Sequence, residues 1–298
     1  MTQRSPLSVG VVGLGAMGGG MAAHLAESGA ETHGFDLSEE ARTRLEDKGV
    51  TVHGTLAALA EAVDVIVLSL PKAEHVEAVC LGAGGLAEVG RAGQIVVDTT
   101  TSMPDVSRRV AAALAGRGMA MLDAPVSGGP SGAASGGMTM MVGGDGDALD
   151  RARPVLDIMT ATVVHVGGSG DGNIAKIANN LLCAAHLLTT AEAMSLAARA
   201  GARPEAVLEA VNAGSGRSGV SQVNFPRWVL SGAYDSGFTM GLMRKDVGLA
   251  VALAKEHGLD LPISMATAEI WRESAQTLAD GEDFNRIVCR IDKALYSE

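Results

Sequence analysis

Residues 1–166 alternate short apolar runs with longer amphipathic segments, and this alternation is the feature that most constrains the fold. The strand-like runs are Ser8–Val12, Thr32–Asp36, Val63–Leu70, Gln94–Thr99, Ala120–Asp123, Met138–Val142 and Val163–Val166. Several intervening segments have helical spacing; in one of them Met17, Met21 and Leu25 recur at every fourth position. Strands that alternate with helices in this way predict a doubly wound, mostly parallel sheet.

The pattern changes at the glycine-rich stretch GGSGDGN, residues 167–173. Residues 174–200 then contain neither proline nor glycine and are apolar on most sides of a helix, which predicts a long buried helix that joins two domains. The remaining segments are helical in pattern: Pro204–Asn212, Met243–His257 and Ser264–Thr277. We therefore expect an α/β domain over residues 1–166 and an all-α domain over residues 167–298.

Charge and composition narrow the class of function. Lys and Arg number 23 against 34 Asp and Glu, which gives a net charge of −11, and aromatic residues make up only 3%. These values argue against a nucleic-acid binder and against a basic membrane-surface helix. No run approaches about 18 uninterrupted apolar residues and no signal-peptide pattern is present, so we expect no transmembrane helix and a cytoplasmic location.

Cysteine and histidine usage gives no sign of a metal centre. Cys80, Cys183 and Cys289 lie far apart and form no CxxC pair, so neither a disulfide framework nor a thiolate metal site is expected. Asp145 and Asp147 are typical of a solvated turn, and no His, Asp or Glu cluster has metal-ligand spacing. We expect no metal.

The segment GLGAMG follows the first strand and opens a helix. Its glycines suit a tight turn, a close approach of backbone to a pyrophosphate, and contact between helix and strand, while the helix N-terminus offers free N–H groups to phosphates. This pattern predicts a Rossmann-type dinucleotide site. The predicted cofactor-binding residues here are Gly13, Leu14, Gly15, Ala16, Met17 and Gly18.

Asp36 ends the second predicted strand, where a carboxylate can bind both ribose hydroxyls and repel a 2′-phosphate. The next residues, Leu37 and Ser38, supply no arginine for that phosphate, which favours NAD over NADP. The alternative is that Asp36 only forms the turn before a helix cap at Ser38. Leu70 and Pro71 follow another strand, at the sheet edge where open α/β sheets bind ligands, so we assign them to the cofactor as well.

Two further segments carry candidate chemistry. Ser127, Gly128 and Gly129 expose consecutive backbone N–H groups that suit a carboxylate, although a flexible linker has a similar composition. Lys176 and Asn180 lie on one face near the start of the long helix, with Asn179 beside them. A lysine in such an apolar helix needs a partner and becomes usable as an acid or base, unless it reaches solvent at the helix end.

Taken together, four ordered motifs resemble the β-hydroxyacid dehydrogenase family, which includes 3-hydroxyisobutyrate dehydrogenase, tartronate semialdehyde reductase and L-threonate dehydrogenase. They are GLGAMG (13–18), DAPVSGG (123–129), GDGNIAKIANN (170–180) and LMRKD (242–246). The resemblance implies that Lys176 is catalytic and that residues 127–129 hold the substrate carboxylate. It also implies that Asn180 hydrogen-bonds the substrate and that Thr101 and Lys245 contact the cofactor.

The chain departs from its relatives at several positions. His75 stands where some family members carry a cofactor-contacting Asn, and Gly19 and Gly20 stand where larger residues are common. Asn179 replaces the His that follows the catalytic Lys in 6-phosphogluconate dehydrogenases, which argues against oxidative decarboxylation. Imine reductases usually lack the Lys that this chain has. Arg217, in a glycine-rich loop, is either a second substrate anchor or a surface side chain.

These observations predict an oxidoreductase that transfers a hydride between NAD and a small β-hydroxyacid such as 3-hydroxyisobutyrate, with Lys176 as general acid and base. Tartronate semialdehyde and L-threonate are alternative substrates. A non-catalytic NAD-binding sensor is an alternative of another class, and an imine reductase is a third. The apolar all-α domain leads us to expect a homodimer or homotetramer.

Overall fold

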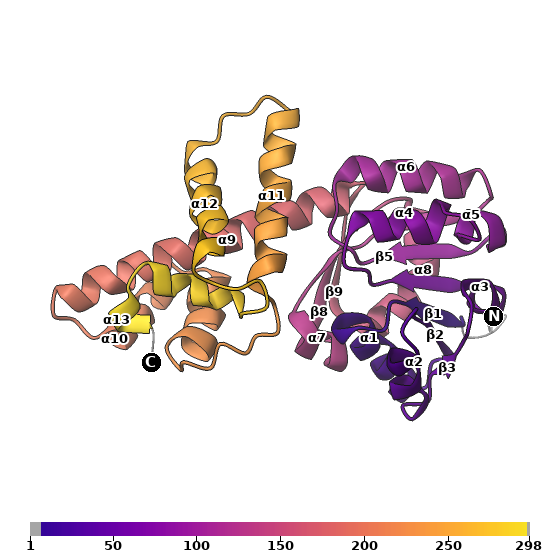
Figure 1. The fold of residues 1–298 in the computed structure, drawn as a ribbon, viewed down its shortest axis with the longest axis horizontal. Helices are drawn as coiled ribbons and strands as arrows, with labels where there is room; N and C mark the ends of the chain where they lie inside the picture. The colour runs from indigo at the N-terminus through magenta and orange to yellow at the C-terminus, as the bar shows by residue number, and fades with distance from the viewer. Residues whose placement is uncertain (1–6, 297–298) are drawn as a thin grey trace. The chain divides into compact units, whose positions relative to one another are not determined.

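The computed structural model describes residues 7–296. Its internal contacts divide the chain between Lys176 and Ile177 into two compact units, called here the N-terminal and the C-terminal unit. The N-terminal unit is α/β and the C-terminal unit is helical (Figure 1).

The described part of the N-terminal unit contains a nine-stranded sheet with the order β3-β2-β1-β4-β5-β6-β8-β7, in which β9 pairs with β8. The strands are β1 (Val9–Val12), β2 (Thr32–Phe35), β3 (Thr51–Val52), β4 (Val65–Leu68), β5 (Ile95–Asp98), β6 (Ala120–Asp123), β7 (Val126–Ser127), β8 (Met138–Gly143) and β9 (Thr160–Gly167). Pairing is parallel from β3 to β6, and β8 is antiparallel to both β6 and β7. The predicted mostly parallel sheet is confirmed.

Helices cover both faces of this sheet (Figure 1). Val9 and Val11 of β1 belong to one core cluster, which includes residues of α1 and α8, whereas Val12 belongs to a second cluster with residues of α3 to α6. Burial on both faces explains the continuous apolar runs of the parallel strands. The helices of the unit are α1 (Ala16–Glu27), α2 (Glu39–Glu46), α3 (Leu56–Ala62), α4 (Ala73–Leu81), α5 (Leu86–Val89), α6 (Pro104–Ala115), α7 (Gly129–Ser135) and α8 (Gly146–Met159).

Sequence periodicity missed two strands, β3 and β7. Each has only two residues, which is too short for an alternating pattern to stand out. The first four expected strands extend one to four residues beyond the observed ones, and the fifth, Ala120–Asp123, matches β6. The last two were predicted too short: β8 ends one residue later than expected, and β9 begins three residues earlier and ends one residue later.

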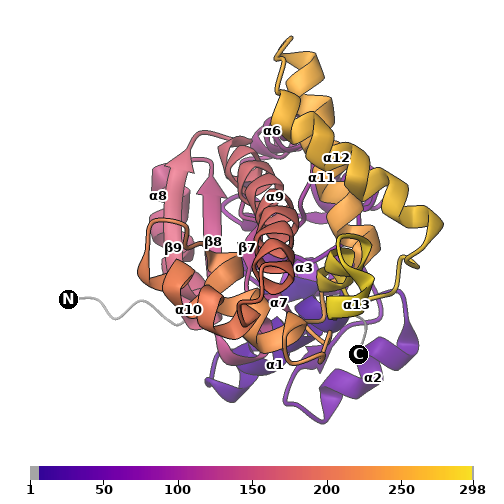
Figure 2. The ribbon, with the colours of Figure 1, turned by 90° about the vertical axis from the view of Figure 1, so that its left-hand side faces the viewer.

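In the C-terminal unit the expected helical character is confirmed. Its elements are α9 (Asp171–Arg199, from Ile177 onward), α10 (Pro204–Ala213), the π-helix η1 (Val220–Val229), α11 (Met240–Glu256), α12 (Pro262–Glu273), the 3₁₀ segments η2 (Ser274–Gln276) and η3 (Phe284–Arg290), and α13 (Lys293–Tyr296). They enclose one core cluster that includes Phe225, Trp271 and Ile287. Figure 2 labels α9, α10, α11, α12 and α13 of this unit. The π-helix was not predicted; it contains Pro226, which has no backbone N–H to donate.

The expectation that α9 is buried on all sides is wrong. Leu187 and Leu188 are buried in the C-terminal core, but Leu182 and Leu196 are 57% and 73% exposed. Two hydrogen bonds mark the covered face: the indole Nε1 of Trp271 donates to a carbonyl of α9 at 3.2 Å, and the Tyr296 hydroxyl donates to another at 2.9 Å. The other helices of the C-terminal unit cover one side of α9 and leave its opposite side exposed.

By length and composition alone, α9 is the single helix within residues 7–296 that is long and apolar enough to cross a membrane. The expectation from uninterrupted apolar runs did not select it, because Lys176, three asparagines and other polar residues interrupt its apolar run. Its packing on the C-terminal core cluster and the burial of Lys176 and Asn180 favour an internal helix.

The C-terminal core predicts a stability effect that fluorescence can isolate, since Trp228 and Trp271 both lie in this unit. Phe225 is fully buried and meets the Tyr296 ring edge-on, so Phe225→Ala should lower the free energy of unfolding by about 3–5 kcal/mol in a denaturant titration followed by tryptophan emission. Val223→Ala, on the same helix but 47% exposed, is the control and should change it by less than about 0.5 kcal/mol. Equal effects of the two variants would contradict the described core.

Candidate active site

The turn after β1 has the geometry of a phosphate cradle. Gly13 has φ = +90°, and a Cβ there would lie 2.3 Å from the Ser69 carbonyl oxygen. A Cβ on Gly18 would lie 1.8 Å from the Gly13 carbonyl oxygen, so neither position accepts a larger residue. Gly15, by contrast, faces open space and begins α1 without a side-chain cap. The free N–H groups of that helix end and the space beside Gly15 fit the pyrophosphate of a dinucleotide.

Asp36 is held beside this turn. Its Oδ2 accepts from the backbone N–H of Leu14 at 2.7 Å, and its Oδ1 accepts from the N–H of Ser38 at 2.8 Å. The carboxylate therefore forms the turn before α2 and also ties the end of β2 to the glycine-rich turn. The Leu14 side chain is fully buried and its N–H already has an acceptor, so Leu14 supports the cradle from behind.

Two arginines that sequence reasoning missed lie at the same place. Nη1 of Arg42 donates to the carbonyl oxygen of Asp36 at 2.6 Å, and Nη2 of Arg44 donates to the carbonyl oxygen of Leu14 at 2.7 Å. Both belong to α2, whose helical turn returns them to the end of β2. The signal for these arginines in the sequence is their place in the first two turns of the helix that follows Asp36.

Neighbouring strand ends contribute the other predicted cofactor residues. The N–H of Leu70 donates to Oγ1 of Thr100 at 3.3 Å, so the turns after β4 and β5 are joined directly before Thr101. Pro71 is exposed beyond that turn. His75 is exposed on α4.

The glycine loop before α7 lies at the far end of this edge. Ser127 pairs with Thr139 of β8, while Gly128 and Gly129 adopt φ values of +137° and +64°, a region that favours glycine. The loop at residues 127–129 and the dinucleotide turn after β1 therefore both belong to the N-terminal unit. Gly20 explains one departure from the family pattern, because a Cβ there would already be 3.3 Å from Ala133 of α7, and α1 packs closely on α7.

Lys176 is only 6% exposed on α9, in the last position of the N-terminal unit. One turn earlier, the fully buried Asn173 accepts a hydrogen bond from the N–H of Ser102 at 2.9 Å and donates to Oγ of Ser107 at 3.0 Å. Positions 173 and 176 share a helix face. The face of α9 that carries Lys176 is therefore anchored to the segment that directly follows Thr101.

A buried carboxylate caps the start of α9. Asp123, at the end of β6, accepts from the N–H of Gly170 at 2.7 Å and from the N–H of Asn173 at 2.9 Å. Burial raises the pKa of Asp123, and the two N–H donors oppose that rise because they stabilise the ionised form. Sequence reasoning treated Asp123 only as the first letter of a motif; its place at a strand end before a glycine-rich helix start was the available signal.

In the C-terminal unit a second buried carboxylate organises two predicted site residues. Asp246, 2% exposed, accepts from Nδ2 of Asn180 at 2.5 Å and lies 3.1 Å from Nζ of Lys245. Nδ2 of Asn179 in turn donates to Oδ1 of Asn180 at 3.0 Å. Arg217 is not part of this group: it is exposed, and its Nη1 donates to the Gly214 carbonyl oxygen of its own loop at 3.4 Å.

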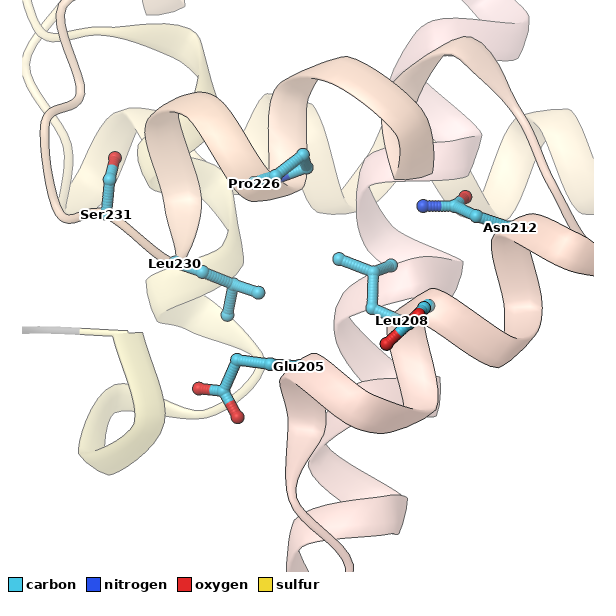
Figure 3. A pocket seen from close by; sticks show the side chains of 7 residues that line it. Glu205, Leu208, Asn212, Pro226, Leu230 and Ser231 are labelled. Atoms are coloured by element: carbon cyan, nitrogen blue, oxygen red, sulfur yellow. The ribbon is translucent and has the colours of Figure 1, made fainter.

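Other features of the described residues lie apart from this chemistry. Within residues 7–296 no group of three or more His, Cys, Asp or Glu side chains is arranged to hold a metal ion. Burial raises the pKa of the Cys80 thiol well above its usual range, so this thiol is inert. A hollow of about 480 Å³ in the C-terminal unit contains no predicted site residue (Figure 3). It is lined by Glu205, Leu208, Glu209, Asn212, Pro226, Leu230 and Ser231.

Comparison with known proteins assigns these motifs. Residues 8–167 match the family model of the NAD binding domain of 6-phosphogluconate dehydrogenase, and residues 170–291 match that of the NAD-binding domain of NADP-dependent 3-hydroxyisobutyrate dehydrogenase. The chain belongs to the β-hydroxyacid dehydrogenase family of 3-hydroxyisobutyrate dehydrogenase-like proteins. A member of this family is an NAD(P)-dependent oxidoreductase that acts on the CH–OH group of a small hydroxyacid, which decides against the non-catalytic sensor.

Individual relatives align over nearly their whole length. The chain is 34% identical to 2-(hydroxymethyl)glutarate dehydrogenase of Eubacterium barkeri, over 95% of this chain and 94% of that protein. It is 35% identical to 3-hydroxyisobutyrate dehydrogenase of Pseudomonas aeruginosa, over 94% and 96%. The solved structure of Mycobacterium tuberculosis 3-hydroxyisobutyrate dehydrogenase with L-serine is similar with a TM-score of 0.89 and 31% identity, over 97% of this chain and all of that one. Two of these three proteins are named for 3-hydroxyisobutyrate and one for 2-(hydroxymethyl)glutarate.

The strand β2, which ends directly before Asp36, carries His33, and His33 pairs with His53, the residue that follows β3. Nδ1 of His33 lies 2.9 Å from Nε2 of His53, and Nε2 of His33 lies 3.5 Å from Glu31. Burial and the neighbouring His33 lower the pKa of His53 below its ordinary 6.5, so the folded chain favours its neutral form. This contribution to stability is complete above pH 6.5 and is lost as the pH falls through the lowered pKa.

His53→Gln should therefore lose less melting temperature than the unmodified protein when the pH is lowered from about 7.5 to about 5.5, because the glutamine does not titrate. Far-UV circular dichroism measures this. The exposed His257 provides the control, since His257→Gln should follow the unmodified protein. If His53→Gln also followed it, the pair would not affect stability.

Proposed function

We propose that the protein transfers a hydride reversibly between NAD and a small β-hydroxyacid of the 3-hydroxyisobutyrate type, with Lys176 as general acid and base. The observation that carries the proposal is the burial of Lys176 one turn after Asn173, whose side chain is bonded to the segment following Thr101. A buried amine is readily tuned for proton transfer.

In this proposal each part of the chain has one role. The backbone N–H groups at Ser127, Gly128 and Gly129 hold the substrate carboxylate, and the two positive-φ glycines of that loop support it. Asn180 donates a hydrogen bond to the substrate, and its orientation is set by Asp246. Arg217 binds the far end of the substrate, where candidate hydroxyacids differ.

The proton step follows from these roles. In oxidation the neutral amine of Lys176 accepts the hydroxyl proton, and in reduction the ammonium form returns it to the carbonyl oxygen. The nicotinamide, when bound, accepts or delivers the hydride. Holding the reacting atoms about 3–3.5 Å apart is most of what the protein must do.

The proposed cofactor-binding set combines residues 13–18, Asp36, Leu70, Pro71 and Thr101 of the N-terminal unit with Lys245. The Asp36 carboxylate supports NAD, because it would repel a 2′-phosphate. Arg42 lies beside it and would attract that phosphate, so the preference rests on the carboxylate alone.

Lys176→Met should lower kcat by about 10²–10⁴-fold while the dissociation constant of NAD stays within about threefold, because methionine keeps the buried stem and removes the amine. Stopped-flow kinetics gives the first value and cofactor fluorescence titration the second. Lys255→Met, on the exposed side of α11, is the matched control and should keep the unmodified kcat. A Lys176→Met enzyme with unmodified kcat would remove this residue from the reaction.

Asp36→Asn should raise the ratio of kcat/KM for NADP to that for NAD by about tenfold or more, since it removes the repelling charge and leaves the Arg42 guanidinium in place. The double variant Asp36→Asn/Arg42→Leu should lose most of that gain. Steady-state kinetics with both cofactors tests this. An enzyme that already prefers NADP, or a ratio that does not change, would contradict the assigned role of Asp36.

Glycerate, the reduced form of tartronate semialdehyde, and L-threonate present the same carboxylate and β-hydroxyl as 3-hydroxyisobutyrate. A spectrophotometric panel of β-hydroxyacids with NAD and NADP distinguishes them by kcat/KM. We also propose a substrate and assembly domain over residues 167–298, a cofactor domain over residues 1–166, a cytoplasmic location, and a homodimer or homotetramer. The exposed leucines of α9 support the assembly.

A further inference from the structure

The Asp123 side chain joins two segments that the proposed reaction needs at a constant separation. It ends β6, four residues before the Ser127 loop, and its two oxygens accept from two N–H groups at the start of α9. The side chain is 1% exposed. A charged acceptor this deeply buried favours one geometry of its donors strongly, because water cannot replace either bond.

Backbone packing holds the same turn of α9 against the sheet. A Cβ on Gly172 would lie 2.3 Å from the Asp123 carbonyl oxygen and 2.6 Å from the Met141 carbonyl oxygen. A Cβ on Gly143 would lie 2.6 Å from the N–H nitrogen of Gly172 and 2.7 Å from Oδ1 of Asp123. The helix therefore approaches the sheet as closely as two backbones allow, and only glycine permits the Asp123 bonds to form.

Asn173 ties the turn on its other side. Its N–H is one of the two donors to Asp123, while its side chain accepts from the N–H of Ser102 and donates to Ser107. The turn is thus bonded to both β6 and the segment after β5. Lys176 lies one helical turn after Asn173, so any tilt of the turn that contains Asn173 displaces the Lys176 amine.

We propose that Asp123 is a positioning residue that sets the place of the Lys176 amine relative to the Ser127–Gly129 loop. The inference deepens the proposed function and rests on the role of Lys176 in it. Asp123 touches neither substrate nor cofactor in this proposal; it acts through the helix turn it caps. A displacement of about 1 Å at the reacting centre lowers rates by about 100-fold, so a cap can control the reaction without joining it.

The chain offers a matched control for a carboxylate that only caps a helix. Asp145 caps α8, and its Oδ1 accepts from the N–H of Ala148 at 2.9 Å. This helix belongs to the same unit and carries no proposed site residue. Asp123→Asn and Asp145→Asn both replace a helix-capping carboxylate by an amide, the first buried and the second exposed, so a loss of turnover confined to Asp123→Asn is assigned to the buried cap of α9.

The test measures kcat, KM, the melting temperature and the pH dependence of oxidation for both variants of the full chain. Asp123→Asn should lower kcat by about 10–100-fold with KM for NAD within about threefold, and Asp145→Asn should lower the melting temperature with kcat unchanged. The rate of oxidation rises with pH as Lys176 loses its proton. Because Asp123→Asn displaces the amine, it should reduce the height of this rise, and Asp145→Asn should leave the rise unchanged.

Other charges at this turn are the same in every variant. The Asp171 carboxylate lies 3.7 Å from Nη2 of Arg108, and Nε of Arg108 donates to the Ser169 carbonyl oxygen at 3.1 Å. A change in the pH profile of Asp123→Asn alone is therefore assigned to the Asp123 substitution.

A kcat within twofold of the unmodified enzyme, or equal losses in Asp123→Asn and Asp145→Asn, would overturn the proposal. Should Asp123→Asn not fold, Asn173→Ala carries the test: it keeps the carboxylate, removes the tie to Ser102, and must lower kcat at least about fivefold. Failure of the proposed function would give a different result, because Lys176→Met would retain activity. An inactive Lys176→Met with a fully active Asp123→Asn would reject the positioning role alone.

Discussion

The register of the parallel strands is the constraint on which the rest of the N-terminal unit depends, because it places the carboxyl ends of β1, β4, β5 and β6 side by side. Val12 of β1 pairs with Leu68 of β4, Leu68 with Asp98 of β5, and Asp98 with Asp123 of β6. Because these partners are the last residues of their strands, the turns that follow them all begin at one edge. The dinucleotide turn, the Leu70 turn, the Thr101 segment and the Ser127 loop therefore share an edge without any contact being needed to gather them.

Buried polar groups at this edge then make the arrangement specific. Asp123 and Asn173 are almost fully buried, and the hydrogen bonds described for them lead to the first turn of α9 or to the segment after β5. Apolar packing alone would let the helix start slide or tilt at little free-energy cost. Buried hydrogen bonds do not, because breaking one leaves an unpaired group away from water. In the C-terminal unit Asp246 does the same for Asn180.

Much of this could be predicted from residues close together in the sequence. The GLGAMG turn, its following helix and Asp36 lie within one strand–helix–strand unit, where spacing determines geometry. The long helix was recognisable because residues 174–200 contain neither proline nor glycine and are apolar on most sides of a helix. What failed were features set by distant partners: β3 and β7 exist only through pairing, the exposed side of α9 depends on which helices cover it, and Arg42 reaches Asp36 only once α2 has formed.

The sequence by itself determined the fold class, the dinucleotide turn and the candidate Lys176, because each depends on local periodicity, backbone freedom at glycine, or residue type. Tertiary structure alone decided that Asp123 caps the helix carrying that lysine, since Asp123 and Gly170 are 47 positions apart and no local pattern relates them. It also decided that Asp246 lies beside Asn180, 66 positions away. Contacts over such separations follow from how strands and helices pack, which spacing along the chain does not encode.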